Sequence, residues 1–302
     1  MHLLISRSMM LFFVLVTCQI TQAQDFGQLK TELDAILSTY KARVGVAIHT
    51  HDFTDSLIID GHHRFPFQSL YKFHLGIAVL DRVDKGQYDL DQPIAISKKD
   101  VTTPLYSPIK KLYPEGTTLT LRELLQYSIA KSDNVACDIL FDLVGGPDAV
   151  QAYFTKNGYG DLSIKLTEQV QQKDWDLQFQ NWTTVAACNR ILHDYYTNDG
   201  GLLSPDSHLF LWDTMRSTQT GKDRIKGSLP DHTQVAHKTA YSGKQQTTGI
   251  IAAAHDIGVV SLPDDKVFYI TVLITDCEVD EPIASKIIAE AAKAAYNNHI
   301  IF

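Results

Sequence analysis

Residues 67–73 read Phe-Gln-Ser-Leu-Tyr-Lys-Phe, and they open the long apolar helix that we predict over Ser69 to Asp84. Within this stretch, Ser69-Leu70-Tyr71-Lys72 is a complete S-x-x-K motif. Because residues three apart share one face of a helix, the spacing places the Lys72 amine beside the Ser69 hydroxyl. The positive end of the helix dipole lies at Ser69 and favours negative charge there. Burial among apolar neighbours is expected to lower the pKa of Lys72, so that the amine can accept a proton.

Two further motifs follow in a fixed order. Ser132-Asp133-Asn134 is a complete S-D-N motif ahead of a predicted helix, and Lys238-Thr239-Ala240 is a K-T-G motif with alanine in place of glycine. Each motif alone fits an ordinary structural role, such as a helix cap, a loop or a surface lysine on a strand edge. The ordered set of three instead indicates a serine nucleophile activated by a buried lysine, which is the chemistry of acyl transfer.

The other residues of these motifs have separate predicted roles. Ser132 is placed to pass a proton between Lys72 and a leaving nitrogen. Asn134 is expected to orient a substrate amide and to hold Lys72. On the predicted strand, Lys238 and Thr239 are expected to face the cleft, where the lysine attracts a substrate carboxylate and the threonine hydrogen-bonds to it.

The bulk composition fits a soluble globular protein with a large core, since 44% of its 302 residues are hydrophobic and 21% are charged. A net charge of -8 and the lack of a basic cluster argue against a nucleic-acid partner or an anionic membrane. We find no C-x-x-C, no H-E-x-x-H and no paired histidine spacing, so we expect neither a metal nor a cofactor. Cys137 and Cys188 fit apolar helix cores rather than a disulfide framework. Nothing in the sequence marks an oligomer, so we expect a monomer.

Residues 1–23 predict a signal peptide. Arg7 gives a positive start, Met9 to Val16 is apolar, and the small Ala23 offers a cleavage site. The apolar run is too short to span a bilayer, so stable membrane insertion is not expected. Cys18 lies in a loosely lipoprotein-like sequence, but the residue before it is bulkier than such sites usually take. We therefore expect a periplasmic protein cut after Ala23.

The pattern of strands and helices predicts an α+β fold. Segments rich in Val, Ile and Thr are expected to be strands at residues 44–49, 56–60, 234–239, 248–255 and 267–275. Helical periodicity dominates between them, which predicts a five-stranded antiparallel sheet flanked by helices, with an all-helical domain inserted into it. The predicted sheet domain is discontinuous, comprising residues 24–66 and 214–302, and the helical domain comprises residues 67–213. The cleft between the two is the expected site.

From about Val44 to the C-terminus the chain resembles the class A serine β-lactamases, and in particular an extended-spectrum branch found in Bacteroidetes-type relatives. The matching segments are Phe67 to Phe73, Leu105 to Pro108, Pro114 to Leu125, Thr220 to Ile225 and the three motifs above. The resemblance implies that Ser69 is the acylated nucleophile and that Tyr106 borders the cleft. It also implies that the backbone N–H groups of Ser69 and Tyr241 form an oxyanion hole.

The same resemblance places a water-activating glutamate at Glu168, within the segment Leu166 to Gln172. Residues 173–182 look like the long form of this loop in the branch named above. Glutamate is a usual general base, although a solvated loop carboxylate is the alternative interpretation. Whether Lys72 or Glu168 starts acylation stays open at this point.

Several positions depart from the commonest class A pattern. Gln172 replaces an asparagine that helps to hold the hydrolytic water. Leu166 and Asn181 replace an arginine and an aspartate that often pair across the loop, so the loop must be held in another way. Ala240 adds a Cβ on the substrate-reading strand, and Tyr241 stands where a small hydroxyl residue is usual.

We therefore expect a serine β-lactamase that hydrolyses penicillins and cephalosporins and confers antibiotic resistance, with turnover weakened or narrowed by Ala240 and Tyr241. One alternative is a penicillin-binding protein or D,D-peptidase that stays acylated, against which Glu168 argues. Another is a non-enzymatic β-lactam-binding or sensor domain, supported only by Ala240 and Tyr241. A metal-dependent hydrolase lacks ligands.

Overall fold

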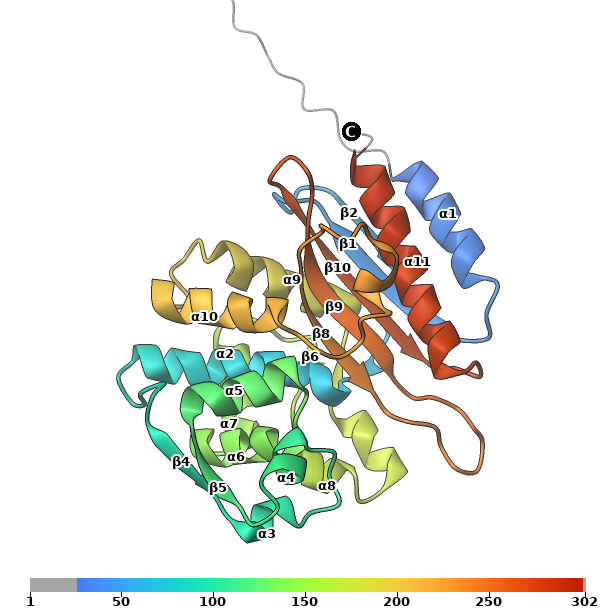
Figure 1. The fold of residues 1–302 in the computed structure, drawn as a ribbon. Helices are drawn as coiled ribbons and strands as arrows, with labels where there is room; N and C mark the ends of the chain where they lie inside the picture. The colour runs from blue at the N-terminus through green and yellow to red at the C-terminus, as the bar shows by residue number, and fades with distance from the viewer. Residues whose placement is uncertain (1–25, 301–302) are drawn as a thin grey trace, which may run out of the picture.

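The computed structural model describes residues 26–300, so the predicted signal peptide and Cys18 lie outside the described residues (Figure 1). Five strands form one antiparallel sheet in the order β2-β1-β10-β9-β8. These strands are β1 (Arg43–His49), β2 (Ser56–Ile59), β8 (Val235–Tyr241), β9 (Ala254–Ser261) and β10 (Val267–Thr275). The predicted α+β architecture, with its sheet built from both ends of the chain, is confirmed.

One strand prediction is wrong. The strand predicted at residues 248–255 is displaced, because β9 begins only at Ala254 and runs to Ser261, so residues 248–253 lie outside it. Gly249 has a φ of 73°, which interrupts an extended strand. The Ser242 hydroxyl accepts the backbone N–H groups of Ala252 and Ala253, and this holds the segment as a loop beyond the end of β8. Its apolar residues therefore serve the loop packing rather than a ladder.

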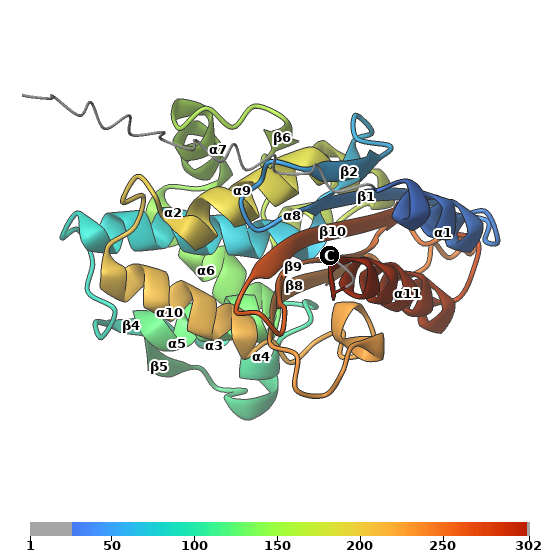
Figure 2. The same cartoon turned by 90° about the horizontal axis from the view of Figure 1, so that it is seen from above.

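Helices cover both faces of the sheet (Figures 1 and 2). On one face, α1 (Gly27–Leu37) and α11 (Glu281–Ile300) lie side by side and bury an apolar cluster with the sheet. On the other face, α9 (Val185–Thr197) packs against β1 and β10, while α10 (Pro205–Arg216) packs against β8. Both α9 and α10 pack against the sheet and also against other helices. The division into a helical domain of residues 67–213 and a sheet domain of residues 24–66 and 214–302 therefore stays a prediction.

Helix α2 (Tyr71–Asp84), in which residues 71–80 are all buried, contacts α10 and three further helices, α5 (Leu121–Ala130), α6 (Asn134–Val144) and α7 (Pro147–Lys156). The remaining helices are α3 (Lys98–Val101), α4 (Pro108–Leu112) and α8 (Glu168–Gln171), with 3₁₀ turns η1 (Gln68–Leu70), η2 (Trp175–Gln180) and η3 (Ile225–Ser228). Short strands are β3 (Phe65–Pro66), β4 (Pro93–Ile96), β5 (Thr117–Thr120), β6 (Leu162–Ser163) and β7 (Trp182–Thr183). A capping box of Thr120 and Glu123 opens α5.

The helix predicted from Ser69 begins two residues later. Ser69 lies in η1, and α2 starts at Tyr71. The turn η1 contacts β8, so the first motif is carried directly against the strand that holds the third. The helical part and the sheet thus meet at Ser69.

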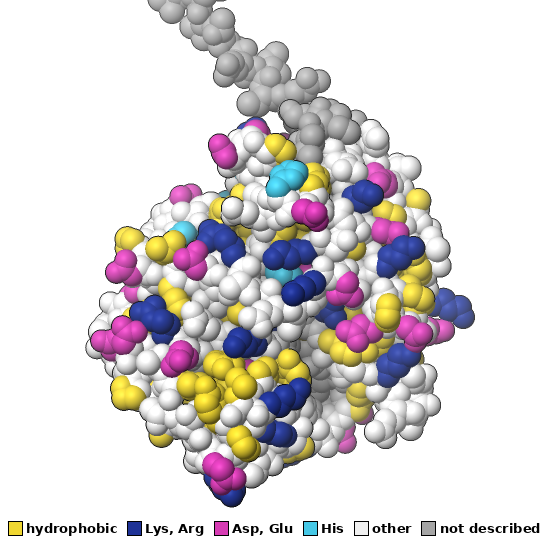
Figure 3. Space-filling view, in the orientation of Figure 1, with side chains coloured by type: hydrophobic (Ala, Val, Ile, Leu, Met, Phe, Trp, Pro, Cys, Tyr) yellow, Lys and Arg dark blue, Asp and Glu magenta, His cyan; other side chains and the backbone are white. Residues whose placement is uncertain are grey.

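The surface and the cysteines agree with the composition. On the face shown in Figure 3, acidic and basic side chains are interspersed rather than gathered into one basic patch. Cys137, Cys188 and Cys277 are buried and unbridged, as the sequence predicts for the first two. No helix within residues 26–300 is both long enough and apolar enough to cross a bilayer.

Candidate active site

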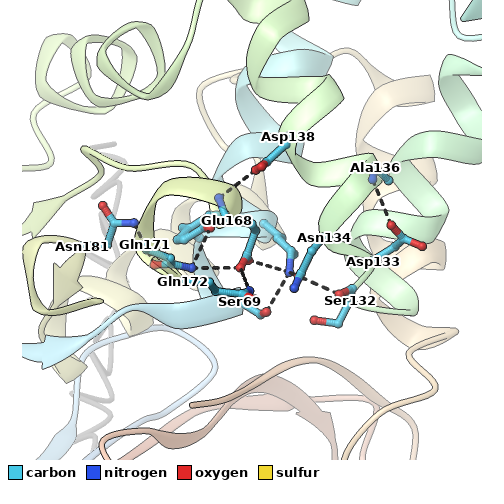
Figure 4. Close-up of polar contacts among 12 residues, drawn as sticks. Ser69, Ser132, Asp133, Asn134, Ala136, Asp138, Glu168, Gln171, Gln172 and Asn181 are labelled. Atoms are coloured by element: carbon cyan, nitrogen blue, oxygen red, sulfur yellow. Dashed lines mark hydrogen bonds and ion pairs between the residues drawn. The ribbon is translucent and has the colours of Figure 1, made fainter. Parts of the chain in front are cut away.

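The nucleophile of the first motif sits on a constrained turn. Gln68 has a φ of 44°, a left-handed conformation that is unfavourable for a non-glycine residue, and its side-chain amide donates to Gln178 Oε1 at 2.6 Å. In the next residues Lys72 Nζ donates to Ser69 Oγ at 2.7 Å (Figure 4). The predicted serine–lysine pair is therefore within hydrogen-bond distance.

Lys72 Nζ is the centre of the polar contacts. It donates to Asn134 Oδ1 at 2.5 Å and to the backbone oxygen of Ser132 at 3.2 Å. It also forms an ion pair with Glu168 Oε1 at 2.8 Å, and both of these side chains are buried. One amine thus joins the first two motifs to the glutamate that the resemblance singled out.

The ion pair decides which group carries the proton. Burial opposes the charge on Lys72, but the neighbouring carboxylate of Glu168 outweighs it and raises the pKa of the lysine. Burial opposes the charge on Glu168 as well, but Lys72 and hydrogen bonds from Gln171 lower the pKa of the glutamate. The lowered pKa expected for Lys72 is therefore wrong, because the sequence did not show that a carboxylate is buried with it. Of the two partners, Glu168 is therefore the one that holds no proton.

Ser132 lies between two lysines. Its φ is 57°, and its hydroxyl accepts Lys238 Nζ at 3.0 Å, while its backbone oxygen accepts Lys72. Lys238 also donates to the backbone oxygen of Thr239 at 2.8 Å. Burial, followed by repulsion from Lys72, lowers the pKa of Lys238 well below its ordinary value. The arrangement suits a hydroxyl that relays a proton.

One side chain of the third motif differs from the prediction. Lys238 was predicted to face the cleft, but its side chain is fully buried behind Ser132, where it supports the hydroxyl instead. Thr239 does line the cavity, and its hydroxyl bonds that of Thr220 at 2.6 Å. Ala240 shares the face of Lys238 by strand alternation and is only 3% exposed.

A cavity of about 1030 Å³ opens in front of these residues. Its floor includes Ser69, Ser132 and Asn134, and the exposed Tyr106 borders it as predicted. Residues 171–175 with Gln178 form one wall and residues 239–247 another. Within residues 26–300, no three His, Cys, Asp or Glu side chains are grouped so that they could hold a metal ion.

Known proteins are similar to this chain in sequence and in fold. The family model described as the β-lactamase enzyme family matches residues 28–299. The chain belongs to the β-lactamase enzyme family. Beta-lactamase VEB-1 of Pseudomonas aeruginosa is 41% identical over 96% of this chain and 95% of that protein. Extended-spectrum beta-lactamase PER-1 of the same organism is 38% identical over 89% of this chain and 86% of that protein.

The structural comparison agrees. The crystal structure of a class A β-lactamase from Bacteroides cellulosilyticus has a TM-score of 0.87 and 33% identity, and it covers 93% of this chain and 100% of that one. This chain is therefore a class A serine β-lactamase, as its resemblance to an extended-spectrum, Bacteroidetes-type branch implied.

In this β-lactamase, Glu168 is held by Gln172, which the sequence singled out, and by Asp138 and Gln171, which it did not. The backbone N–H groups of Glu168 and Gln169 donate to the Asp138 carboxylate at 2.7 and 2.8 Å. Glu168 Oε2 accepts amides from Gln171 at 2.9 Å and from Gln172 at 3.0 Å (Figure 4). Asp138 follows Asn134 by four residues on α6, and that spacing on one helix face was the signal that could have identified it.

The loop that carries Glu168 is held by hydrogen bonds in place of the arginine–aspartate ion pair that this chain lacks. Asn181 is fully buried, and its Oδ1 accepts the backbone N–H groups of Lys165 at 2.7 Å and Leu166 at 2.9 Å. Its Nδ2 donates to the backbone oxygen of Leu166 at 2.9 Å and to Gln171 Oε1 at 3.1 Å. In this β-lactamase the neutral side-chain amide of Asn181 therefore stabilises the loop in place of an arginine–aspartate pair.

The second motif is braced through its middle residue. Asp133 accepts the Ser107 hydroxyl, the Ile109 N–H and the Ala136 N–H, each between 2.8 and 2.9 Å. The Asn134 N–H donates to the backbone oxygen of Tyr106 at 3.1 Å. These bonds fix Ser132 and Asn134 on either side of Lys72 in the β-lactamase.

Proposed function

We propose that this class A β-lactamase opens the β-lactam ring of penicillins and cephalosporins through an acyl-enzyme on Ser69, and that it thereby confers antibiotic resistance. The observation that carries the proposal is the placement of Lys72 Nζ at 2.7 Å from Ser69 Oγ and 2.8 Å from Glu168 Oε1. A nucleophile and a buried carboxylate base share one amine, which is the arrangement that acylation followed by hydrolysis needs.

Acylation begins when Ser69 Oγ attacks the β-lactam carbonyl carbon. The hydroxyl proton passes to the Lys72–Glu168 pair, in which Glu168 is the group that holds no proton at the start. The ring C–N bond breaks, and Ser132 gives its proton to the departing nitrogen and is reprotonated from a neighbouring lysine. The backbone N–H groups of Ser69 and Tyr241 stabilise the oxyanion.

Deacylation uses water. Glu168 removes a proton from a water molecule, whose oxygen attacks the ester carbonyl, and the Ser69 C–O bond breaks to release the opened product. Gln172, whose amide bonds Glu168 Oε2, helps to orient the carboxylate and its water. The residues that bind the substrate are Asn134, Tyr106, Lys238, Thr239, Tyr241 and Gln172, with Lys238 acting through the Ser132 hydroxyl to which it donates.

The proposal is tested by following acylation and turnover together. With a chromogenic cephalosporin, the wild-type protein should show a transient mass adduct and steady turnover. Glu168→Gln removes the base and should keep the adduct for hours, with kcat lowered by roughly 10²–10⁴. Ser69→Ala should form no adduct.

Two results would contradict the proposal. A persistent adduct on the wild-type protein, unchanged by Glu168→Gln, would mean that the protein behaves as a penicillin-binding protein. No adduct at all on correctly folded protein would mean that β-lactams are not its substrates.

We also propose that the mature enzyme is a periplasmic monomer released by cleavage after Ala23. The supporting observation is the sequence of residues 1–23, with its positive start and short apolar run. Acylation of Cys18 as a lipoprotein is the less favoured alternative. Neither a metal nor a cofactor has a role in the proposed reaction, which uses only side chains and water.

A further inference from the structure

A second cavity, of about 760 Å³, opens at the opposite end of α2 from Ser69. It lies where α2, α5 and α10 pack side by side (Figures 1 and 2). Helix α2 has 14 residues, so its two ends are roughly 20 Å apart. No residue that lines this cavity also lines the one around Ser69. The second cavity is therefore separate from the site of the β-lactam reaction.

Four carboxylates line this second cavity, those of Asp84, Asp89, Asp206 and Asp213. Asp206 and Asp213 are seven residues apart on α10, which is roughly 10 Å along the helix. Of the four, only Asp213 has an ion-pair partner within residues 26–300, the exposed Arg216 at 2.6 Å. An exposed pair of this kind is weak and leaves most of the attraction for another cation in place.

One cationic side chain, that of Arg122, lines the same cavity, but its charge is already engaged. Its Nε donates to Asp91 at 2.9 Å, and Asp91 does not line the cavity. Its guanidinium carbon lies 5.4 Å from the centre of the Phe210 ring, in a cation–π contact. The balance of charge in the cavity therefore stays negative.

The cavity also holds a buried hydroxyl whose hydrogen-bonding capacity is unused. Thr214 lines the cavity and is 2% exposed, and its Oγ1 forms no hydrogen bond to any residue in the range 26–300. A buried hydroxyl without a partner is unfavourable, so a donor bound in the cavity would relieve that cost. An ammonium group carries three N–H donors and no acceptor, which matches this position beside the carboxylates.

The spread of the carboxylates decides the kind of cation. Within the described residues no three acidic, His or Cys side chains are close enough together to hold a metal ion, so a compact divalent cation does not fit. The lining also includes the apolar side chains of Val83, Leu90 and Phe210. A fitting ligand must therefore carry separated positive charges joined by apolar segments, because methylene chains pack on apolar surface while their charged ends stay with the acids. A linear polyamine such as spermidine has this form.

We propose that this cavity is a second binding site, which takes a linear polyamine. The ammonium groups of the polyamine pair with Asp89, Asp206 and Asp213, and one of them donates to Thr214 Oγ1. The site goes beyond the proposed β-lactamase reaction and does not depend on it.

Binding here would reinforce the contact between two helices. Asp84, at the end of α2, accepts the hydroxyls of Ser204 and Ser207 at the start of α10, each at 2.6 Å. A polyamine in the cavity adds charged contacts across the same junction. Since only the folded protein forms the cavity, the ligand stabilises the fold.

The test measures binding of spermidine to the mature protein by calorimetry and thermal unfolding, at a low ionic strength of about 20 mM so that charges are little screened. At ten times its dissociation constant, spermidine should raise the melting temperature of the wild type by about 2–5 °C. The double variant Asp206→Asn with Asp213→Asn should bind spermidine at least roughly ten-fold more weakly, because two attracting charges are lost. Thr214→Val keeps every charge and should weaken binding by roughly two- to ten-fold.

The chain offers a matched control for Asp206. Pro147 and Asp148 open α7 as Pro205 and Asp206 open α10, and both aspartates are exposed in the first turn of their helix. Asp148 does not line the cavity. Asp148→Asn and Asp206→Asn thus remove the same charge from the same kind of position, but only Asp206→Asn should weaken the binding of spermidine.

Three results would overturn the inference. The first is the absence of both binding heat and a shift in melting temperature for the folded wild type. The second is equal affinity for spermidine in the wild type, the double variant and Thr214→Val. The third is an equal rise in melting temperature with magnesium chloride at matched ionic strength, which would mean that spermidine acts only by screening charge. If the double variant does not fold, Thr214→Val and Asp206→Asn still decide the question, and no β-lactam enters any of these measurements.

Discussion

Ala240 is the residue at which the substrate-reading strand departs most simply from its family. Its methyl group lies on the same face as Lys238, is 3% exposed and belongs to the large apolar cluster beneath the strand, although the residue also borders the cavity. The sequence predicts that this methyl weakens or narrows turnover, which requires it to act on the substrate in the cavity. Its burial instead favours packing in the apolar cluster as the main role of the methyl group.

Ala240→Gly measures that balance at the residue scale. We expect a loss of about 0.5–1 kcal/mol in the free energy of unfolding, because glycine in a strand adds chain entropy and removes a packed methyl. kcat/KM should change less than about three-fold, since packing and not substrate crowding is affected. Urea unfolding and steady-state kinetics give both numbers. A gain of ten-fold or more in kcat/KM would show instead that the methyl obstructs the substrate.

The residues of the site differ in how far the sequence could identify them. Ser69 and Lys72 meet because three residues of helix bring them together, so their contact follows from local spacing. Glu168 could be placed only by family resemblance, because nothing local links it to Lys72. The shift in the pKa of Lys72 was then predicted in the wrong direction. That direction depends on the carboxylate of Glu168, which lies 96 residues further along the chain.

At the scale of elements, the site depends on how α6 meets α8. Asp138 on α6 accepts the first two N–H groups of α8, and this fixes the backbone of Glu168. Burial, together with the nearby charge of Glu168, raises the pKa of Asp138 to about 7. The junction between these two helices is therefore sensitive to pH.

The sign of this sensitivity follows from the proton count. A folded pKa of about 7, against 3.8 in the unfolded chain, means that the folded protein holds a proton which the unfolded chain releases. The stabilisation is complete below about pH 4 and is lost as the pH rises through 7. Between pH 5 and 8 we expect the wild type to lose about 1–2 kcal/mol of stability relative to Asp138→Asn, after allowance for solvent screening. Urea unfolding at both pH values would measure this; parallel pH profiles would disprove it.

Elements were predictable where their signals were local. Thr120 and Glu123, which are spaced as a capping box, and Gly145, the left-handed residue after α6, mark helix ends by local sequence alone. The strand placed at residues 248–255 failed because β-rich composition cannot show that Ser242 will gather the segment into a loop. The four hydrogen bonds of Asn181 could not be predicted from the sequence either, although the sequence did show that some substitute for an ion pair was required.

At the scale of the whole molecule, the number of reactive cysteine thiols tests both the cleavage of the signal peptide and the burial of the remaining cysteines. The full chain has four cysteines, of which Cys137, Cys188 and Cys277 are buried in the described part. If cleavage follows Ala23, the purified mature protein should show almost no fast reaction with a thiol reagent when native and three reactive thiols when denatured. An N-terminal sequence starting at Gln24 should accompany that count. Four thiols, or a lipid-modified Cys18, would contradict the proposed processing.

The pairing of β1 with β10 has a consequence for how the chain folds during its synthesis. Arg43 lies opposite Thr275, so β1 cannot pair with β10 until a segment much further along the chain has been synthesised. Contacts of such long range are slow to form, and the sheet cannot close while its final strands are still missing. A polypeptide emerging from the ribosome would therefore stay open until β10 has been made, and an open chain of this kind suits the export that we propose.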